Sequence, residues 1–140
     1  MTIIRKAKPG DTSHLEILFQ LTRQQAFDSR PANEFTLGDY QKSTSDDEVW
    51  VIEKNDTIVG FVSTYPAYNF IHNLFVHPAH QKQGYGIQLL QIAEANLAKP
   101  MTLKIALYNL KVCSFYKMHG WHQLSINQDA EEPYVLYGKG

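Results

Sequence analysis

The feature that most constrains the fold is a succession of strand, turn, helix and strand in the middle of the chain. Residues 69–76, NFIHNLFV, are a short apolar run typical of a strand, and a polar turn begins at His77-Pro78. Apolar residues then recur at helical spacing over about 86–98, and MTLKIALY at 101–108 predicts the next strand. Two strands joined through a helix are typically parallel neighbours, so the pattern predicts an α/β fold with a crossover helix.

The flanking segments extend this sheet on both sides. Short runs rich in β-branched and aromatic residues predict further strands, at 2–8, 48–54, 57–65, 121–126 and 133–139. Helical spacing or composition predicts further helices, from the turn at 9–14 to before Pro31, over 36–45 and over 110–120. Asn55-Asp56 is a hairpin turn signal, and Gly120 is a C-terminal helix cap signal. The resulting order is strand, helices, three strands, helix, strand, helix and two strands.

Composition limits the classes of protein and partner. With 140 residues, 44% of them apolar and 19% charged, the chain is expected to form one ordered domain over 1–140. A net charge of −1 gives no reason to expect nucleic acid or an anionic membrane as partner. The single cysteine, Cys113, excludes an intrachain disulfide. The N-terminal segment has no apolar secretory core, and no apolar run reaches the roughly 18 residues of a membrane span, so a cytoplasmic location is expected.

The turn before the central helix carries two glycines, Gly84 and Gly86. The first N–H groups of a helix lack intrahelical partners, and the helix dipole is positive there, so this position favours an anion. Glycine also leaves the backbone open to a ligand, and Lys82 adds a positive charge. Leu89 stands where a dinucleotide fingerprint needs its third glycine, and the G-K-[ST] of a P-loop is absent. A glycine-assisted turn without a ligand remains an alternative on these residues.

Two motifs in order resemble the GNAT superfamily of N-acetyltransferases. Residues 81–86, QKQGYG, are similar to its R/Q-x-x-G-x-G/A motif between the fourth strand and the next helix. Residues 109–121, NLKVCSFYKMHGW, are similar to its N-x-x-A-x-x-F-Y-x-x-x-G-F motif, with mild departures at Val112, Cys113 and Trp121. The resemblance covers about Phe70 to Leu124, and it is only architectural before that.

The resemblance implies a single-domain fold and a donor. The implied fold is a mixed, mostly antiparallel sheet of about seven strands, with helices on both faces and a splay between strands 4 and 5. The implied donor is acetyl-CoA, with its pyrophosphate on the amides from Gln83 to Ile87 and its pantetheine arm along the fourth strand. The residues expected to bind it are Leu74, Phe75, Val76, Gln81, Lys82, Gln83, Gly84, Tyr85, Gly86, Ile87 and Asn109.

The same resemblance implies direct attack of a primary amine on the thioester. Tyr116 matches the family tyrosine that assists the leaving thiolate, although it is also a candidate core residue beside Phe115. The fourth strand has no carboxylate, so His72 is expected to be the base, because imidazole accepts protons near neutral pH. Strand alternation places His72 on the face of Phe70, Leu74 and Val76. A satisfied rim histidine, with a water relay as the base, is the alternative.

The acceptor is expected to be a small-molecule amine, with a peptide left open. Candidate acceptor-binding residues are Phe27, Tyr40 and Tyr65. The histidines lack zinc-site spacing, so no metal is expected. A homodimer is left open. Two other functions compete with the enzyme: a non-catalytic acyl-CoA-binding sensor, and a generic phosphate- or nucleotide-binding domain.

Overall fold

Seven strands form one twisted sheet in the computed structural model, which describes residues 2–26, 39–107, 109–130 and 133–140, and the side chains of these except 22–26 and 39. The strands are β1 Thr2–Lys6, β2 Glu48–Lys54, β3 Thr57–Tyr65, β4 Phe70–Val76, β5 Met101–Ala106, β6 His122–Asn127 and β7 Tyr134–Lys139. Their spatial order is β1-β2-β3-β4-β5-β7-β6, and only β4 and β5 pair in parallel. The predicted mixed, mostly antiparallel sheet is therefore confirmed.

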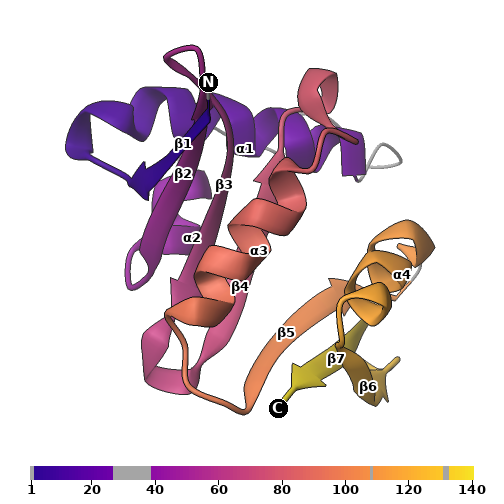
Figure 1. Cartoon of the computed structure of the whole chain (residues 1–140). Coiled ribbons are helices and arrows are strands. Elements are labelled where there is room, and N and C mark those ends of the chain that lie inside the picture. Colours follow the sequence, from indigo (N-terminus) through magenta and orange to yellow (C-terminus); the bar gives the residue numbers. More distant parts are fainter. Residues whose placement is uncertain (1, 27–38, 108, 131–132) are drawn as a thin grey trace.

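Helices cover both faces of this sheet, as predicted (Figure 1). The helices are α1 Thr12–Ala26, α2 Asp39–Thr44, α3 Tyr85–Ala95 and α4 Leu110–Met118. Short 3₁₀ turns lie between elements, at Pro9–Asp11, Pro66–Tyr68 and Pro78–His80. The crossover helix α3 is shorter than the predicted 86–98, because the Asn96 side chain donates a hydrogen bond to the Ile92 carbonyl and the last turn closes there.

Two apolar cores lie on opposite faces of the sheet. The larger one lies under α3 and α4, where Leu89, Leu90 and Ala93 repeat at helical spacing and are at most 1% exposed. The smaller one lies under α1 and α2 and is built from Leu15, Leu18, Phe19, Tyr40, Val51 and Phe61. The sheet is therefore a partition between two layers of helices, and its central strand β4 contributes side chains to both layers.

The parallel strands β4 and β5 separate after two residue pairs. Phe70 pairs with Thr102 and Ile71 with Leu103, and the register ends there. Figure 1 shows β5 turning away from β4 beyond these pairs. The rest of β4 keeps its ladder to β3 and has one edge without a strand partner, which confirms the predicted splay.

A bulge in β4 overturns the expectation that His72 shares a face with Leu74 and Val76. In the ladder to β3, Ser63 pairs with Asn73 and Thr64 with Ile71, so His72 is the extra residue. Strand alternation shifts at this point: Ile71 faces the α3 core together with Leu74 and Val76. His72 instead lies beside Phe70 and the end of α2, with ring centroids 6.0 Å apart in the Phe70–His72 pair.

Candidate functional site

An open helix N-terminus follows β4. Gly84 is the N-cap of α3 with φ +85°, a left-handed conformation that glycine adopts at little cost. Within the described part of the chain, a Cβ at Gly84 would meet no atom within 4 Å, so this position of the turn is not packed against a neighbour. Two hydrogen bonds connect the glycine turn to neighbouring strands. The Gln81 side chain donates to the Val76 carbonyl of β4 at 3.0 Å, and the Lys54 side chain of β2 donates to the Gln83 side chain at 3.4 Å. This geometry suits an anion on the helix N-terminus.

A cavity of about 570 Å³ lies between this turn, the second half of β4 and α4. It contains nine of the residues predicted to bind the donor or to act on it: Leu74, Val76, Gln81, Lys82, Gly84, Tyr85, Gly86, Ile87 and Tyr116. The cavity is also lined by four residues that the sequence had not predicted to bind the donor: His80, Lys111, Val112 and Phe115. The cavity thus combines backbone amides and lysines at one end with apolar side chains at the other.

Three residues predicted to bind the donor do not line this cavity. The Phe75 side chain points to the other face of the sheet, where it packs edge-on against Phe19 and Phe61. Gln83 receives the Lys54 hydrogen bond on the outside of the turn. Asn109 precedes α4, where its carbonyl accepts from the Cys113 amide at 3.1 Å. For Phe75 and Gln83, only the backbone is left as a means of contact with a ligand.

Tyr116 closes the apolar end of the cavity. Its side chain is 5% exposed and packs at right angles to Phe115 and Trp121, with ring centroids 5.2 and 5.9 Å away. Burial raises the pKa of Tyr116 well above its usual value, and the negative charge of Glu94 raises it further. The phenol therefore stays protonated at neutral pH, so it can donate a hydrogen bond but is a weaker acid than free tyrosine.

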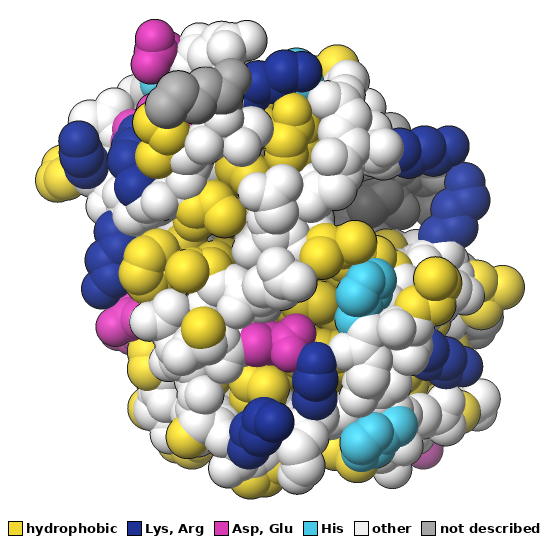
Figure 2. Space-filling model, in the orientation of Figure 1, with side chains coloured by type: hydrophobic (Ala, Val, Ile, Leu, Met, Phe, Trp, Pro, Cys, Tyr) yellow, Lys and Arg dark blue, Asp and Glu magenta, His cyan; other side chains and the backbone are white. Residues whose placement is uncertain are grey.

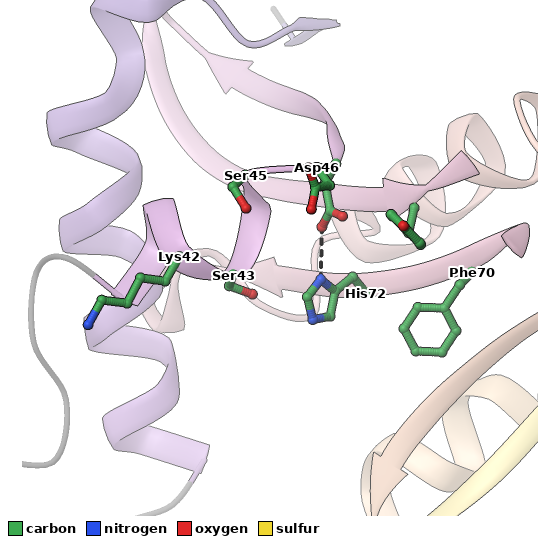
Figure 3. A pocket seen from close by; sticks show the side chains of 8 residues that line it. Lys42, Ser43, Ser45, Asp46, Phe70 and His72 are labelled. Carbon is green, nitrogen blue, oxygen red and sulfur yellow. Dashed lines mark hydrogen bonds and ion pairs between the residues drawn. The ribbon is translucent and has the colours of Figure 1, made fainter. Parts of the chain in front are cut away.

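A second pocket, of about 300 Å³, lies at the other end of β4 (Figure 3). It is lined by Lys42, Ser43, Ser45, Asp46, Asp47, Tyr65, Phe70 and His72. His72 Nδ1 lies 2.9 Å from Asp47 Oδ2, and the side chains of His72 and Asp47 are 41% and 3% exposed. The pocket therefore presents one accessible imidazole whose orientation depends on a buried carboxylate.

The residues predicted to bind the acceptor fall in different places. Tyr65 lines the second pocket. Tyr40 does not, because its ring is 6% exposed and packs edge-on against Phe19 and Phe61 in the core. Burial is also the main reason for the raised pKa of Tyr40. Phe27 lies outside the described residues.

The surface bears no single dominant charge on the face drawn in Figure 2. Lys and Arg side chains lie at several separate places on that face, with hydrophobic side chains between them. Within the part of the chain that the structure describes, no helix is long and apolar enough to cross a membrane. No three His, Cys, Asp or Glu residues in that same part form a group that could hold a metal ion.

Residues 15–121 match the model of the acetyltransferase (GNAT) family. The chain belongs to the GNAT family. The match covers more than half of the chain and includes the glycine turn, the separation of β4 and β5, and Tyr116. No curated protein is similar enough in sequence to count as a match.

Several solved structures share this fold at low sequence identity. Apo-form YjaB from Escherichia coli has a TM-score of 0.81 at 18% identity and covers 99% of this chain and 97% of its own. The PaiA N-acetyltransferase from Thermoplasma acidophilum, in complex with coenzyme A, has 0.78 at 18%, with 100% and 99% covered. A GNAT acetyltransferase from Elizabethkingia anophelis with acetyl-CoA bound has 0.73 at 16%, with 99% and 97% covered.

Proposed function

We propose that this GNAT protein transfers the acetyl group of acetyl-CoA directly to a primary amine of a small molecule. The observation that carries the proposal is the cavity of about 570 Å³ that runs from an open helix N-terminus to the buried hydroxyl-bearing ring of Tyr116. A donor with an anionic end, an extended middle and a thioester matches, in that order, the helix N-terminus, the β4 residues Leu74 and Val76, and Tyr116.

The amides from Gln83 to Ile87, which span the glycine turn and the start of α3, are the proposed site for the pyrophosphate. Gly84 fits this role, because it has a positive φ, adds no side chain of its own, and has no described atom within 4 Å of its Cβ position. Lys82 and Lys111 line the same cavity and supply positive charge. Both contributions favour a polyanion over a neutral ligand.

The free edge of β4 is the proposed site for the pantetheine arm. Pairing with β5 ends at Ile71, so the backbone of Leu74–Val76 has hydrogen-bonding groups on that edge without a strand partner. An arm that carries two amides can add to such an edge as a strand does. Leu74, Val76 and Phe115 provide the apolar walls on which it would lie.

Tyr116 is the proposed partner of the leaving sulfur. As the amine nitrogen bonds to the acetyl carbon, the carbon–sulfur bond breaks and its electron pair goes to sulfur. Tyr116 then donates a hydrogen bond to the thiolate and keeps its own proton, since its pKa is raised by burial. A backbone N–H near Leu74 or Phe75 is the proposed donor to the carbonyl oxygen.

His72 is the proposed base, and the pocket of about 300 Å³ is the proposed acceptor site. His72 and Leu74 are two positions apart on β4 but line different pockets, so acceptor and donor would approach the strand from different sides. His72 Nε2 takes the proton that the attacking amine loses. The volume of the pocket favours a small amine, and Tyr65 and Phe70 give it aromatic walls.

Thiol release from acetyl-CoA in the presence of a panel of small primary amines tests this function. Turnover with at least one amine is expected, together with thermal stabilisation by acetyl-CoA that exceeds stabilisation by ATP or NAD. Tight acetyl-CoA binding without turnover over a broad panel would favour the sensor function. Equal stabilisation by ATP, NAD and acetyl-CoA would favour a generic phosphate-binding domain.

A further inference from the structure

Asp47 and His72 form a pair that joins the loop after α2 to the bulge of β4. The two residues are 25 positions apart in sequence, and His72 Nδ1 lies 2.9 Å from Asp47 Oδ2. The exposed fraction of the Asp47 side chain is 3%, whereas that of His72 is 41%. A carboxylate withdrawn from water in this way is costly unless it is hydrogen-bonded, and His72 supplies that bond.

The position of this carboxylate is fixed by the backbone around it. The Asp47 amide donates to the Thr44 carbonyl at 3.0 Å, and the Thr44 hydroxyl donates to the Tyr40 carbonyl at 2.8 Å. Next to His72, the Asn73 side chain donates to Ser43 at 3.0 Å and to Ser63 at 2.8 Å. These bonds tie the end of α2 to β3 and β4, so Asp47 and His72 are held at a set separation.

The chemistry of the pair determines which imidazole nitrogen is free. An ionised carboxylate only accepts hydrogen bonds, so Nδ1 must carry the proton that it shares with Asp47. In the neutral ring, the lone pair is then on Nε2. Figure 3 shows the other ring nitrogen on the side of the ring away from the dashed bond to Asp47.

We propose that Asp47 is a positioning residue that holds His72 in the Nδ1–H tautomer, with Nε2 aimed at the acceptor amine. Asp47 also offsets the positive charge that forms when Nε2 takes the amine proton. The inference rests on the proposed function, in which His72 is the base. It adds a residue that the motifs of the chain do not mark.

The other groups around His72 do not serve this purpose. Asp46, Lys42 and Tyr65 line the same pocket, and Phe70 lies against the ring. The hydrogen bond to His72 comes from Asp47, while the adjacent Asp46 is exposed. Asp46 and Asp47 therefore carry the same charge in the same pocket but differ in contact with the ring, which makes Asp46→Asn a comparison for Asp47→Asn.

The first experiment measures the tautomer of neutral His72 in the wild-type protein by ¹⁵N NMR. The Nδ1–H form is expected to dominate. In Asp47→Asn, whose side chain can either donate or accept, the Nε2–H population is expected to rise. A dominant Nε2–H form in the wild type overturns the inference, and this result needs no variant to fold and no turnover.

The second experiment compares kinetics with an amine that the wild-type protein acetylates. Losing a hydrogen bond to a charged group predicts a fall in kcat of about 10- to 100-fold in Asp47→Asn. In Asp46→Asn we expect the change mainly in KM, with the His72 tautomer kept. Asp56→Asn, in the exposed β2–β3 turn, is the control for a lost surface charge and should match the wild type.

The outcomes separate this inference from the proposed function. No turnover by the wild type with any amine refutes the proposed function, and the tautomer measurement then decides whether Asp47 positions the ring. Wild-type turnover with an equal kcat in Asp47→Asn overturns the role of Asp47. An equal kcat loss in Asp46→Asn also overturns it, because negative charge alone would then explain the effect.

Discussion

Replacing Tyr116 by Phe removes one hydroxyl from the wall of the cavity of about 570 Å³, the proposed donor cavity, and leaves the ring in place. The ring is 5% exposed and packs against Phe115 and Trp121, contacts that phenylalanine keeps. Burial raises the pKa of the hydroxyl, so in the wild type it is a hydrogen-bond donor that stays protonated. The variant therefore tests hydrogen bonding to the thiolate with little change in packing.

The magnitude follows from the charge of the acceptor. A hydrogen bond to a charged group contributes about 1.5–3 kcal/mol, and each 1.36 kcal/mol is a factor of ten in rate. We expect kcat to fall by about 10- to 150-fold if the thiolate accepts this bond only as it forms. The affinity for acetyl-CoA should change little, because the intact thioester is a weak acceptor.

The assay is thiol release under conditions where the chemical step limits the rate, with a separate titration of acetyl-CoA binding. Tyr134→Phe is the matched control: it removes the same hydroxyl from a tyrosine on β7 that lines neither pocket. The fold decrease in kcat caused by Tyr116→Phe should be the same at pH 7 and pH 9, because the raised pKa keeps Tyr116 of the wild type protonated throughout that range. An unchanged kcat in Tyr116→Phe would refute the role of Tyr116. A loss that disappears at pH 9 would refute the argument from its pKa.

Three further substitutions test other parts of the structure, and one further measurement tests Tyr116→Phe. Gly84→Ala should lower the free energy of unfolding by about 1–2 kcal/mol, because Gly84 has a φ of +85°. Gly10→Ala is the control: the Cβ position of Gly10 is equally free of neighbours, so this substitution should cost less in thermal unfolding. His72→Ala should lower kcat/KM by about 100-fold or more, measured with a neutral amine acceptor, and an unaltered pH profile would remove His72 from the mechanism. The Arg5–Asp11 hydrogen bond lowers the pKa of Asp11 to about 2. The stability that the ionised Asp11 contributes to the fold is therefore present above pH 4 and is lost as the pH falls toward 2. In urea unfolding, Asp11→Asn should lower the free energy of unfolding by up to about 1 kcal/mol at pH 7 but not at pH 2. The raised pKa of Tyr116 has the opposite effect on stability. The neutral phenol contributes fully to the stability of the fold below about pH 10, and this contribution is lost above that pH because ionisation favours the unfolded chain. Tyr116→Phe cannot ionise, so its alkaline unfolding should occur at higher pH.

Local patterns predicted the elements of this fold because strong signals bound them. The strands 48–54 and 57–65 have the predicted ends, since Asn55 and Asp56 adopt the positive φ that a tight hairpin needs. The glycine turn and Tyr116 could be predicted from the sequence for a similar reason, because each lies in a short motif with a fixed spacing. The separation of β4 and β5 followed from the family resemblance, since no local pattern determines where two parallel strands part.

The surroundings of His72 could not be predicted from local sequence patterns, because the long-range pairing of β3 with β4 determines them. The bulge depends on the register between β3 and β4, and no glycine or proline in FIHNLFV marks it. Asp46 and Asp47 are identical neighbours in sequence, yet only Asp47 turns inward to His72. Tyr40 has the composition of a pocket residue, but the core between α1 and β3 buries its ring.

The bulge places His72 and Leu74 in two different pockets, although they are only two positions apart on β4. In a regular strand, positions 72, 74 and 76 would all face α3, and His72 would then lie on the wall of the donor cavity. The extra residue shifts the alternation, so Leu74 and Val76 remain in the donor cavity while His72 reaches Asp47 and the α2 side. Deleting His72 should restore the alternation and remove the imidazole at once. Replacing it by Gln should keep the bulge and lose only the base. Both variants should therefore lose turnover, while acetyl-CoA affinity, measured by titration, should stay near that of the wild type because Leu74 and Val76 keep their ladder to β3.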